Sequence, residues 1–297
     1  MTDKEKGFLL LTCPLGDEKR PRLTMAQFRV LAQRVAAVDA PREERELDAA
    51  DLKALGYGEE MADRILALLA EDAVLEHYLS RGYRAGCQCI SRISGRYPLA
   101  VRQRLGLDAP GCLWSMGDVS LLEMPKVALV GSRDIAPKNL EFAREVGRQA
   151  AKQGFALVSG NARGADKAAQ EACLAAGGCV ISVVTDELKK QTAKENVLYL
   201  SEDGFDEGFS AQRAISRNRV IHALGEVTFV AQAAYQAGGT WDGTVKNLRF
   251  GWSKVCVFRD ESPAQKQLCD MGATAVNTGD LGNLSAFFEM DNSLFEQ

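Results

Sequence analysis

The chain of 297 residues has no apolar run long enough to cross a bilayer. Its first residues include an apolar stretch that is too short for the core of a signal peptide, and no small-residue cleavage site follows it. We therefore expect a cytoplasmic protein with no membrane association. A hydrophobic content of 46% and a charged content of 26% are typical of a globular protein, and the length suits one large or two modest domains.

The sequence also has little of what metal and catalytic sites require. Only Cys87 and Cys89 form a close pair among the eight cysteines, and their spacing is not that of a zinc or redox site, so we expect free and largely buried thiols. The two histidines, His77 and His222, fall in helix-like segments, and we expect both on helix surfaces. There is no HExxH motif, no nucleophile elbow and no Walker loop. We predict a binding protein rather than an enzyme, with no catalytic residues, metal or cofactor.

Positive charge is scarce overall but locally concentrated. The formal net charge is −4, which excludes a protein that is basic throughout. The segment 209–222, however, contains Arg213, Arg217 and Arg219 and no acidic residue. Phosphates respond to the local field, so this segment predicts a local polyanion site.

The first 78 residues have helical periodicity and form the expected N-terminal domain. Thr24 is a plausible N-cap for a helix that continues to Val35. Further on, a helix stops at Gly56 and another starts after Gly58, which resembles a helix-hairpin-helix or SAM-like unit. Because this turn carries two glutamates and no Lys or Arg, a packed helical hairpin is favoured over a nucleic-acid grip.

Beyond a connector at 79–125, strand and helix patterns alternate, which is typical of a parallel sheet covered by helices. We predict an α/β fold: an extended Rossmann-like domain over 79–291, the small helical domain before it, and a tail at 292–297. The expected strands are Val127–Val130, Phe155–Val158, Cys179–Val184, Val227–Ala231 and Lys254–Phe258, and the expected helices are Asn139–Gln153, Ala165–Ala176, Ala211–Leu224, Thr244–Phe250 and Pro263–Met271.

Two glycine-bearing turns follow the first two of these strands. Gly131-Ser132-Arg133 ends one strand, and the segment from Ser159 to Asp166 ends the next. A strand, a glycine turn and a helix N-terminus together favour an anion through backbone N–H groups and the helix dipole. Arg163 would face outward to grip a phosphate, and Asp166 would cap the helix. Two such turns predict a ligand with more than one phosphate.

A third glycine-rich turn, Gly238–Thr244, follows the strand at 227–231. Thr240 and Thr244 could bond phosphate oxygens, while Trp241 could stack on a base or pack against the sheet. The turn matches neither GxGxxG nor a Walker loop, so ATP hydrolysis is not predicted.

These motifs resemble, in order, those of the DNA-processing protein A family, also called DprA or Smf. The resemblance runs from about Tyr97 to Phe288. Its motif words are Tyr97-Pro98, Val130–Arg133, Ser159–Asp166, Ser201-Glu202, Arg217–Ile221, the turn at 238–244 and Gly272-Ala273. The resemblance implies a homodimer that binds single-stranded DNA without sequence preference, protects incoming DNA during natural transformation of a competent cell, and loads the recombinase RecA onto it.

The resemblance also implies which residues bind the phosphates of DNA. By it, Gly131, Ser132, Arg133, Ser159, Gly160, Arg163, Gly164 and Lys167 line a phosphate pocket, and Arg217, Asn218 and Arg219 lie beside it. With Asp166 from the second turn and Gly239 and Thr240 from the third, these residues form the predicted DNA-binding and phosphate-binding set.

Several positions depart from the family pattern and leave alternatives open. Ala165, Gln170 and Gln232 replace the usual Ile, His and Glu, and Gly-Gly-Thr-Trp replaces the usual Ser-Gly-Ser-Leu turn. The third turn also echoes that of lysine-decarboxylase-like enzymes that cleave nucleoside monophosphates, although no Glu follows it here. A nucleotide-sensing module that binds without catalysis would use the same turns.

Overall fold

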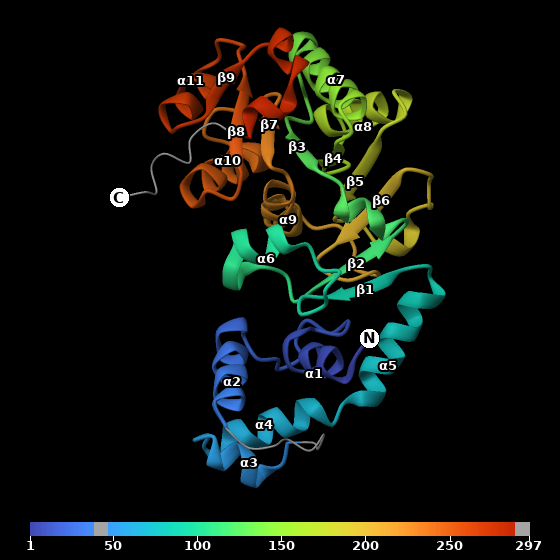
Figure 1. The fold of residues 1–297 in the computed structure, drawn as a ribbon, viewed down its shortest axis with the longest axis vertical. Helices are drawn as coiled ribbons and strands as arrows, with labels where there is room; N and C mark the ends of the chain where they lie inside the picture. Colours follow the sequence, from blue (N-terminus) through green and yellow to red (C-terminus); the bar gives the residue numbers. More distant parts are fainter. Residues whose placement is uncertain (39–46, 289–297) are drawn as a thin grey trace.

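The computed structural model describes residues 1–38 and 47–288. The molecule is elongated, with helices of the first part at one end and a large sheet at the other (Figure 1). It has an α/β fold, as the sequence predicted. The predicted tail at 292–297, and residues 289–291 of the predicted sheet domain, lie outside the described residues.

The described residues of the N-terminal part form the helices α1 (Asp3–Thr12), α2 (Met25–Ala37), α3 (Ala49–Ala54), α4 (Glu59–Leu69) and α5 (Asp72–Arg84). Thr24 caps α2, as expected: its side chain accepts from the Gln27 N–H. The helices α3 and α4 flank the predicted glycine turn. Leu11, Leu31, Leu52 and Ile65 belong to a small hydrophobic cluster that holds α1, α2, α3 and α4 together.

The sheet has nine strands in the order β1-β2-β6-β5-β4-β3-β7-β8-β9. Its members are β1 (Gln88–Ser91), β2 (Cys112–Met116), β3 (Lys126–Val130), β4 (Ala156–Ser159), β5 (Cys179–Val183), β6 (Val197–Ser201), β7 (Val227–Val230), β8 (Lys254–Phe258) and β9 (Thr274–Val276). The strands from β6 to β9 run parallel, whereas β1 and β2 pair antiparallel at one edge. All five predicted strands are present within one residue, but the sequence analysis missed β1, β2, β6 and β9.

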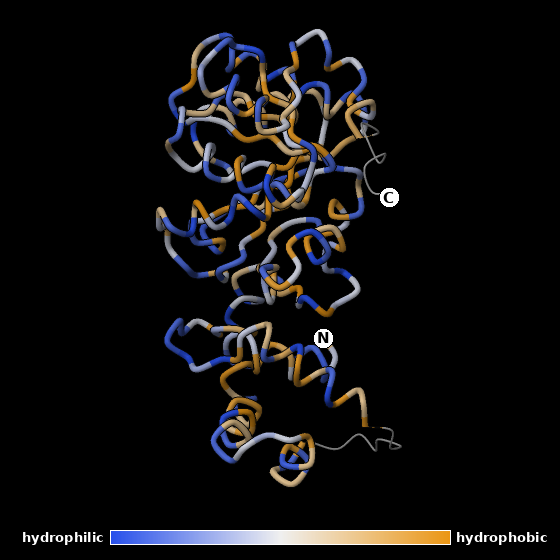
Figure 2. The backbone as a smooth tube through the Cα atoms, turned by 90° about the vertical axis from the view of Figure 1, so that its left-hand side faces the viewer, coloured by the Kyte–Doolittle hydropathy of each residue, from blue (hydrophilic) through white to orange (hydrophobic). Residues whose placement is uncertain are grey.

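Helices cover both faces of the sheet: α6 (Leu99–Leu105), α7 (Pro137–Lys152), α8 (Ala165–Ala175), α9 (Ala211–Leu224), α10 (Gly238–Phe250) and α11 (Pro263–Asp270). Strand side chains alternate between two hydrophobic clusters, as the period of a strand requires. One cluster unites Val127 and Leu129 with α7 and α8. The other unites Ala128 and Val130 with α6, α9 and α11. Hydrophobic stretches accordingly gather in the middle of the sheet domain (Figure 2).

The helical part is not separated from the sheet by a linker. The predicted boundary at residue 78 falls inside α5, and side chains of α1 and α5 belong to the same cluster as the sheet. The ring centroids of Tyr78 and Trp114 lie 5.3 Å apart, and those of Tyr78 and Phe205 lie 5.0 Å apart. Thus α5 packs onto β2 through aromatic contacts.

The eight cysteines are free, and six are buried, in line with the expectation from the sequence. The expectation for His222 was wrong. This side chain is fully buried, with Nδ1 lying 3.2 Å from Thr228 Oγ1 and 3.1 Å from Asn247 Nδ2. Burial lowers the pKa of His222 to about 3 and keeps it neutral. Within residues 1–38 and 47–288, no helix has the length and apolar character needed to cross a membrane.

Candidate functional site

The three glycine turns meet at one edge of the sheet. The strands β4, β3 and β7 are neighbours and run parallel, so the turns that follow them lie side by side at their carboxyl ends. The first two turns touch: a Cβ on Gly131 would lie 2.4 Å from the Ala165 Cβ, and the Ala165 N–H donates to the Ser132 carbonyl (3.3 Å). Glycine is therefore required at Gly131 by close packing.

Position 164 also requires glycine, because of both its backbone conformation and its close neighbours. Its φ is +82°, and a Cβ there would lie 2.4 Å from the carbonyl oxygen of Arg133. The turn after β3 and the start of α8 are thus locked together through backbone atoms. The N–H of Lys167 donates to the Ala162 carbonyl (3.1 Å), so most of the N–H groups at the start of α8 already have acceptors within the protein.

The start of α10 is more open than the start of α8. This helix has no side-chain cap, whereas Ser210 caps α9 and Ser262 caps α11. In the described part of the chain, no group outside α10 accepts from the N–H groups of Gly238, Gly239 and Thr240. Uncapped N–H groups at a helix N-terminus favour an anion, and the helix dipole adds to this preference. The third turn therefore leaves more N–H groups open to an anion than the second turn does.

A cleft of about 560 Å³ joins the first and third turns to α9. Its lining includes the polar groups of Ser132, Arg133 and the N-terminus of α10. It also includes small apolar side chains: Ala211, Ala214 and Ile215 on α9, and Ala234 and Ala237 of the β7–α10 connection. Eight of the predicted site residues line the cleft: Gly131, Ser132, Arg133, Asp166, Arg217, Asn218, Gly239 and Thr240. Its described lining contains no histidine and no cysteine.

Three exposed cations lie on the first two turns and at the start of α8. The Arg133 guanidinium is 5.9 Å from the centroid of the Phe209 ring. Arg163 is 71% exposed, with Nη2 3.1 Å from Asp134 Oδ1, so its ion pair lies in solvent and is readily exchanged. Lys167 lines a neighbouring recess together with Gly164 and Arg133. These three side chains lie in solvent and can reach a phosphate without breaking contacts in the protein core.

Arg217 lines the cleft, but its guanidinium is engaged with backbone carbonyls. Its side chain is buried, and Nη1 donates to the carbonyls of Gly160 (2.5 Å) and Val183. It therefore ties the ends of β4 and β5 together beneath the cleft. Burial raises the pKa of the neighbouring Asp166 to about 6, against the opposing effects of the Arg217 charge and the Ala162 N–H.

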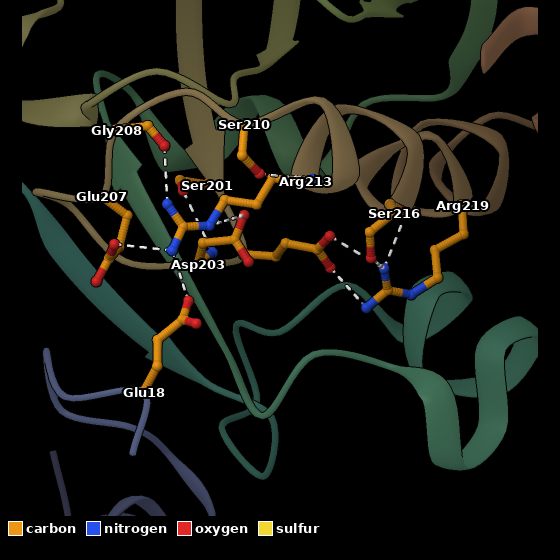
Figure 3. Close-up of polar contacts among 10 residues, drawn as sticks. Glu18, Ser201, Asp203, Glu207, Gly208, Ser210, Arg213, Ser216 and Arg219 are labelled. Atoms are coloured by element: carbon orange, nitrogen blue, oxygen red, sulfur yellow. Dashed lines mark hydrogen bonds and ion pairs between the residues drawn. The ribbon is translucent and has the colours of Figure 1, made fainter. Parts of the chain in front are cut away.

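The other two arginines of this segment are ion-paired, as Figure 3 shows. Arg213 Nη2 lies 2.8 Å from Glu207 Oε2 and 2.5 Å from Glu18 Oε1 of the N-terminal part. Arg219 Nη2 lies 2.7 Å from the carboxylate of Glu202, which is itself buried. The segment contains no acid, but the fold brings acids to it, so its expected positive field is largely neutralised.

Buried hydroxyls of the motif residues are also satisfied internally. Ser159 has no exposed surface, and its Oγ accepts from Gln170 Nε2 (2.5 Å). Thr244 is equally buried, and its hydroxyl donates to the Thr240 carbonyl (2.7 Å). Asn218 Nδ2 donates to the Gly239 carbonyl (2.9 Å) and so connects α9 to the third turn. These residues shape the cleft from within.

Gln232, which the sequence marked only as a departure from the family pattern, stabilises the first turn. Its carbonyl accepts from the N–H (3.0 Å) and the hydroxyl (3.2 Å) of Ser132, and its Oε1 accepts from the Ala136 N–H (2.8 Å). Its place directly after a predicted strand was the one signal in the sequence that could have indicated this role.

A largely parallel sheet with helices on both faces and glycine turns at the carboxyl ends of its strands defines a Rossmann-like fold. The family model of DNA recombination-mediator protein A matches residues 88–280. The chain therefore belongs to this family, which is the one that its motifs resemble.

Individual relatives agree with this assignment. DNA processing protein DprA of Streptococcus pneumoniae is 35% identical over 141 residues, which is 44% of this chain and half the length of that relative. The X-ray structure of DNA processing protein A from the same organism superposes with a TM-score of 0.70 at 24% identity, covering 89% of this chain and 93% of that one. DNA processing protein A of Helicobacter pylori, solved for its single-stranded DNA binding mode, gives a TM-score of 0.58 at 26% identity, covering 67% and 95%.

Proposed function

We propose that this protein binds single-stranded DNA in the cleft between the first turn, α9 and the third turn. The observation that carries the proposal is the mixed lining of the cleft, which combines uncapped N–H groups and Arg133 with small apolar side chains. A nucleotide needs both kinds of group, because its phosphate is anionic and its base presents an apolar face. The relative from Helicobacter pylori binds single-stranded DNA, which supports the assignment.

The structure leads us to divide the predicted site residues into two groups. We propose that Arg133, Arg163 and Lys167 contact phosphates through exposed side chains, and that Gly131, Ser132, Gly239 and Thr240 contact them mainly through the backbone. The remaining predicted residues, Ser159, Gly160, Gly164, Asp166, Arg217, Asn218 and Arg219, would shape and support the cleft.

Family membership supports a wider role. We propose a cytoplasmic homodimer that protects incoming DNA and delivers it to RecA during transformation or recombination, with no catalytic step of its own. The alternative of nucleoside monophosphate cleavage has less support: the one carboxylate in the first turns of α10 is Asp242, which lies 2.8 Å from Lys246 Nζ in an ion pair.

The test is the affinity for a 20-nucleotide oligothymidylate at several salt concentrations. We expect Arg133→Ala combined with Arg163→Ala to weaken binding at least tenfold, because two charge-assisted contacts are lost. The slope of log affinity against log salt should fall by about 1.4, since each phosphate contact on a single strand contributes roughly 0.7.

The matched control is Arg84→Ala, an exposed arginine on α5 that bonds only to Ser80 within the described structure. It should bind as the wild type does. Binding that is insensitive to salt, or a double variant with unchanged affinity, would exclude this cleft as the DNA site.

A further inference from the structure

The connection between β7 and α10 makes a tight turn at the mouth of the cleft. Ala234 and Ala237 both line the cleft and pair with each other in an isolated β-bridge. Gln236 has a φ of +53°, which closes the turn. Tyr235 therefore projects from the tip of a short turn, directly between two residues of the cleft wall and two residues before the N-cap of α10.

The Tyr235 ring is partly exposed, and contacts with Gln236 and Trp241 restrain it. It is 47% exposed, its hydroxyl accepts from Gln236 Nε2 (3.1 Å), and the edge of the Trp241 ring packs against it with centroids 5.6 Å apart at 68°. Trp241 is half-buried and packs onto the hydrophobic cluster that contains α9. A ring braced in this way loses little conformational freedom when a ligand covers it.

Two other exposed apolar side chains line the cleft. Phe209, in the loop before α9, is 53% exposed, and Ile215 on α9 is 43% exposed, while Tyr235 lies on the β7–α10 connection between two lining residues. The small side chains of Ala211, Ala214, Ala234 and Ala237 in the same lining leave room for a planar group. An exposed aromatic ring next to an anion cradle suits a nucleobase whose phosphate lies in that cradle.

We propose that Tyr235 stacks on a nucleobase of the bound strand and gives the cleft a requirement for bases in addition to phosphates. This inference rests on the proposed function. Stacking on the ring face tolerates any base, so the contact adds affinity without sequence preference. A duplex keeps its bases paired and stacked inside, so the same contact selects single strands.

The experiment compares two ligands of equal length and charge: an oligothymidylate and the same sugar–phosphate chain with abasic sites throughout. Tyr235→Ala should bind the oligothymidylate roughly tenfold more weakly than the wild type does. On the abasic chain, the variant and the wild type should have the same affinity. Tyr235→Phe keeps the ring and should stay within about twofold of the wild type on both ligands.

Tyr83→Ala is the matched control, because Tyr83 is 48% exposed and lies on α5. It should leave both affinities unchanged. If the wild type binds the oligothymidylate and Tyr235→Ala binds it equally well, or loses affinity equally for both ligands, the stacking role is wrong while the DNA site stands. If the wild type binds neither ligand, both the function and the inference are wrong.

Discussion

Asp166 places an acid in a cleft that is proposed to bind anions. Its carboxylate is buried, its pKa is raised to about 6, and its Oδ2 accepts from the Ala162 N–H (3.3 Å). A phosphate bound nearby raises this pKa further, because it disfavours a second negative charge. Binding then takes up a proton, so affinity should be greater at low pH and fall as the pH rises through 6 towards 8.

For oligothymidylate, whose bases do not titrate in this range, we expect affinity to fall about fivefold to tenfold between pH 5.5 and pH 8. This range corresponds to a further rise of about one pKa unit on binding. Asp166→Asn keeps the acceptor for Ala162 and removes the charge, so its affinity should be nearly constant over the same range. If the wild type and Asp166→Asn show the same dependence of affinity on pH, Asp166 does not take up a proton on binding.

At the level of single residues, the sequence indicated where some side chains lie but not their partners. Arg163 was expected to face outward and does so. Arg217 and Arg219 were predicted to lie beside the phosphate pocket; the Arg217 guanidinium contacts backbone carbonyls at the cleft, and that of Arg219 contacts Glu202. The difference has a physical reason: exposure of Arg163 follows from its local turn, whereas the partners of the other two come from segments that only the fold brings near.

Among the elements, the junction between the first turn and α8 depends on a backbone conformation. Gly164 combines a φ of +82° with carbonyl oxygens of Ser132 and Arg133 at 2.5 and 2.4 Å from the position of a Cβ. Gly164→Ala must therefore either strain the backbone or push the first turn away. We expect it to lower the free energy of unfolding by more than 2 kcal/mol and to weaken DNA binding.

Gly177 at the other end of α8 provides the control. Its φ is +77°, but nothing lies within 4 Å of a Cβ built there. Gly177→Ala should cost only about 1 kcal/mol in urea denaturation and leave DNA binding unchanged. If both variants lose the same stability, the contact with the first turn is not what requires glycine at Gly164.

Helices and strands with long, regular hydrophobic patterns were predicted correctly, whereas short elements were missed. The apolar parallel strands were identified because buried strands form continuous hydrophobic runs. The strands β1 and β2 were missed because they are short, Pro98 and Pro110 interrupt the segment between them, and they pair antiparallel at one edge of the sheet. The helix α10 was expected to start at Thr244, but it begins at Gly238. The glycines before Thr244 indicated a turn, because glycine is unfavourable inside a helix.

At the scale of the whole molecule, the helical part and the sheet share one hydrophobic core. Phe8, Leu9 and Leu75 belong to the same buried cluster as Trp114 and Phe205 of the sheet domain. Glu18 also reaches across to Arg213 on α9. Sequence composition could not reveal this continuity, because helical periodicity shows which face of a helix is apolar but not which element covers it.

A shared core predicts that the two parts unfold together. A fragment of residues 79–297 begins at the domain boundary that the sequence predicted. In this fragment Trp114 has lost its contact with the Tyr78 ring, and α1 is absent. We expect this fragment to lack a cooperative unfolding transition in urea, monitored by tryptophan fluorescence and near-ultraviolet circular dichroism.

In the full-length chain, Tyr78→Ala should reduce the free energy of unfolding by about 3–5 kcal/mol, because it opens a cavity against Trp114 and Phe205. Tyr83→Ala, five residues further along α5 and 48% exposed, should stay within about 0.5 kcal/mol of the wild type. A fragment 79–297 that unfolds cooperatively at the urea concentration of the intact chain would show that the sheet domain stands alone. In that case the aromatic contacts of Tyr78 would connect two independent domains.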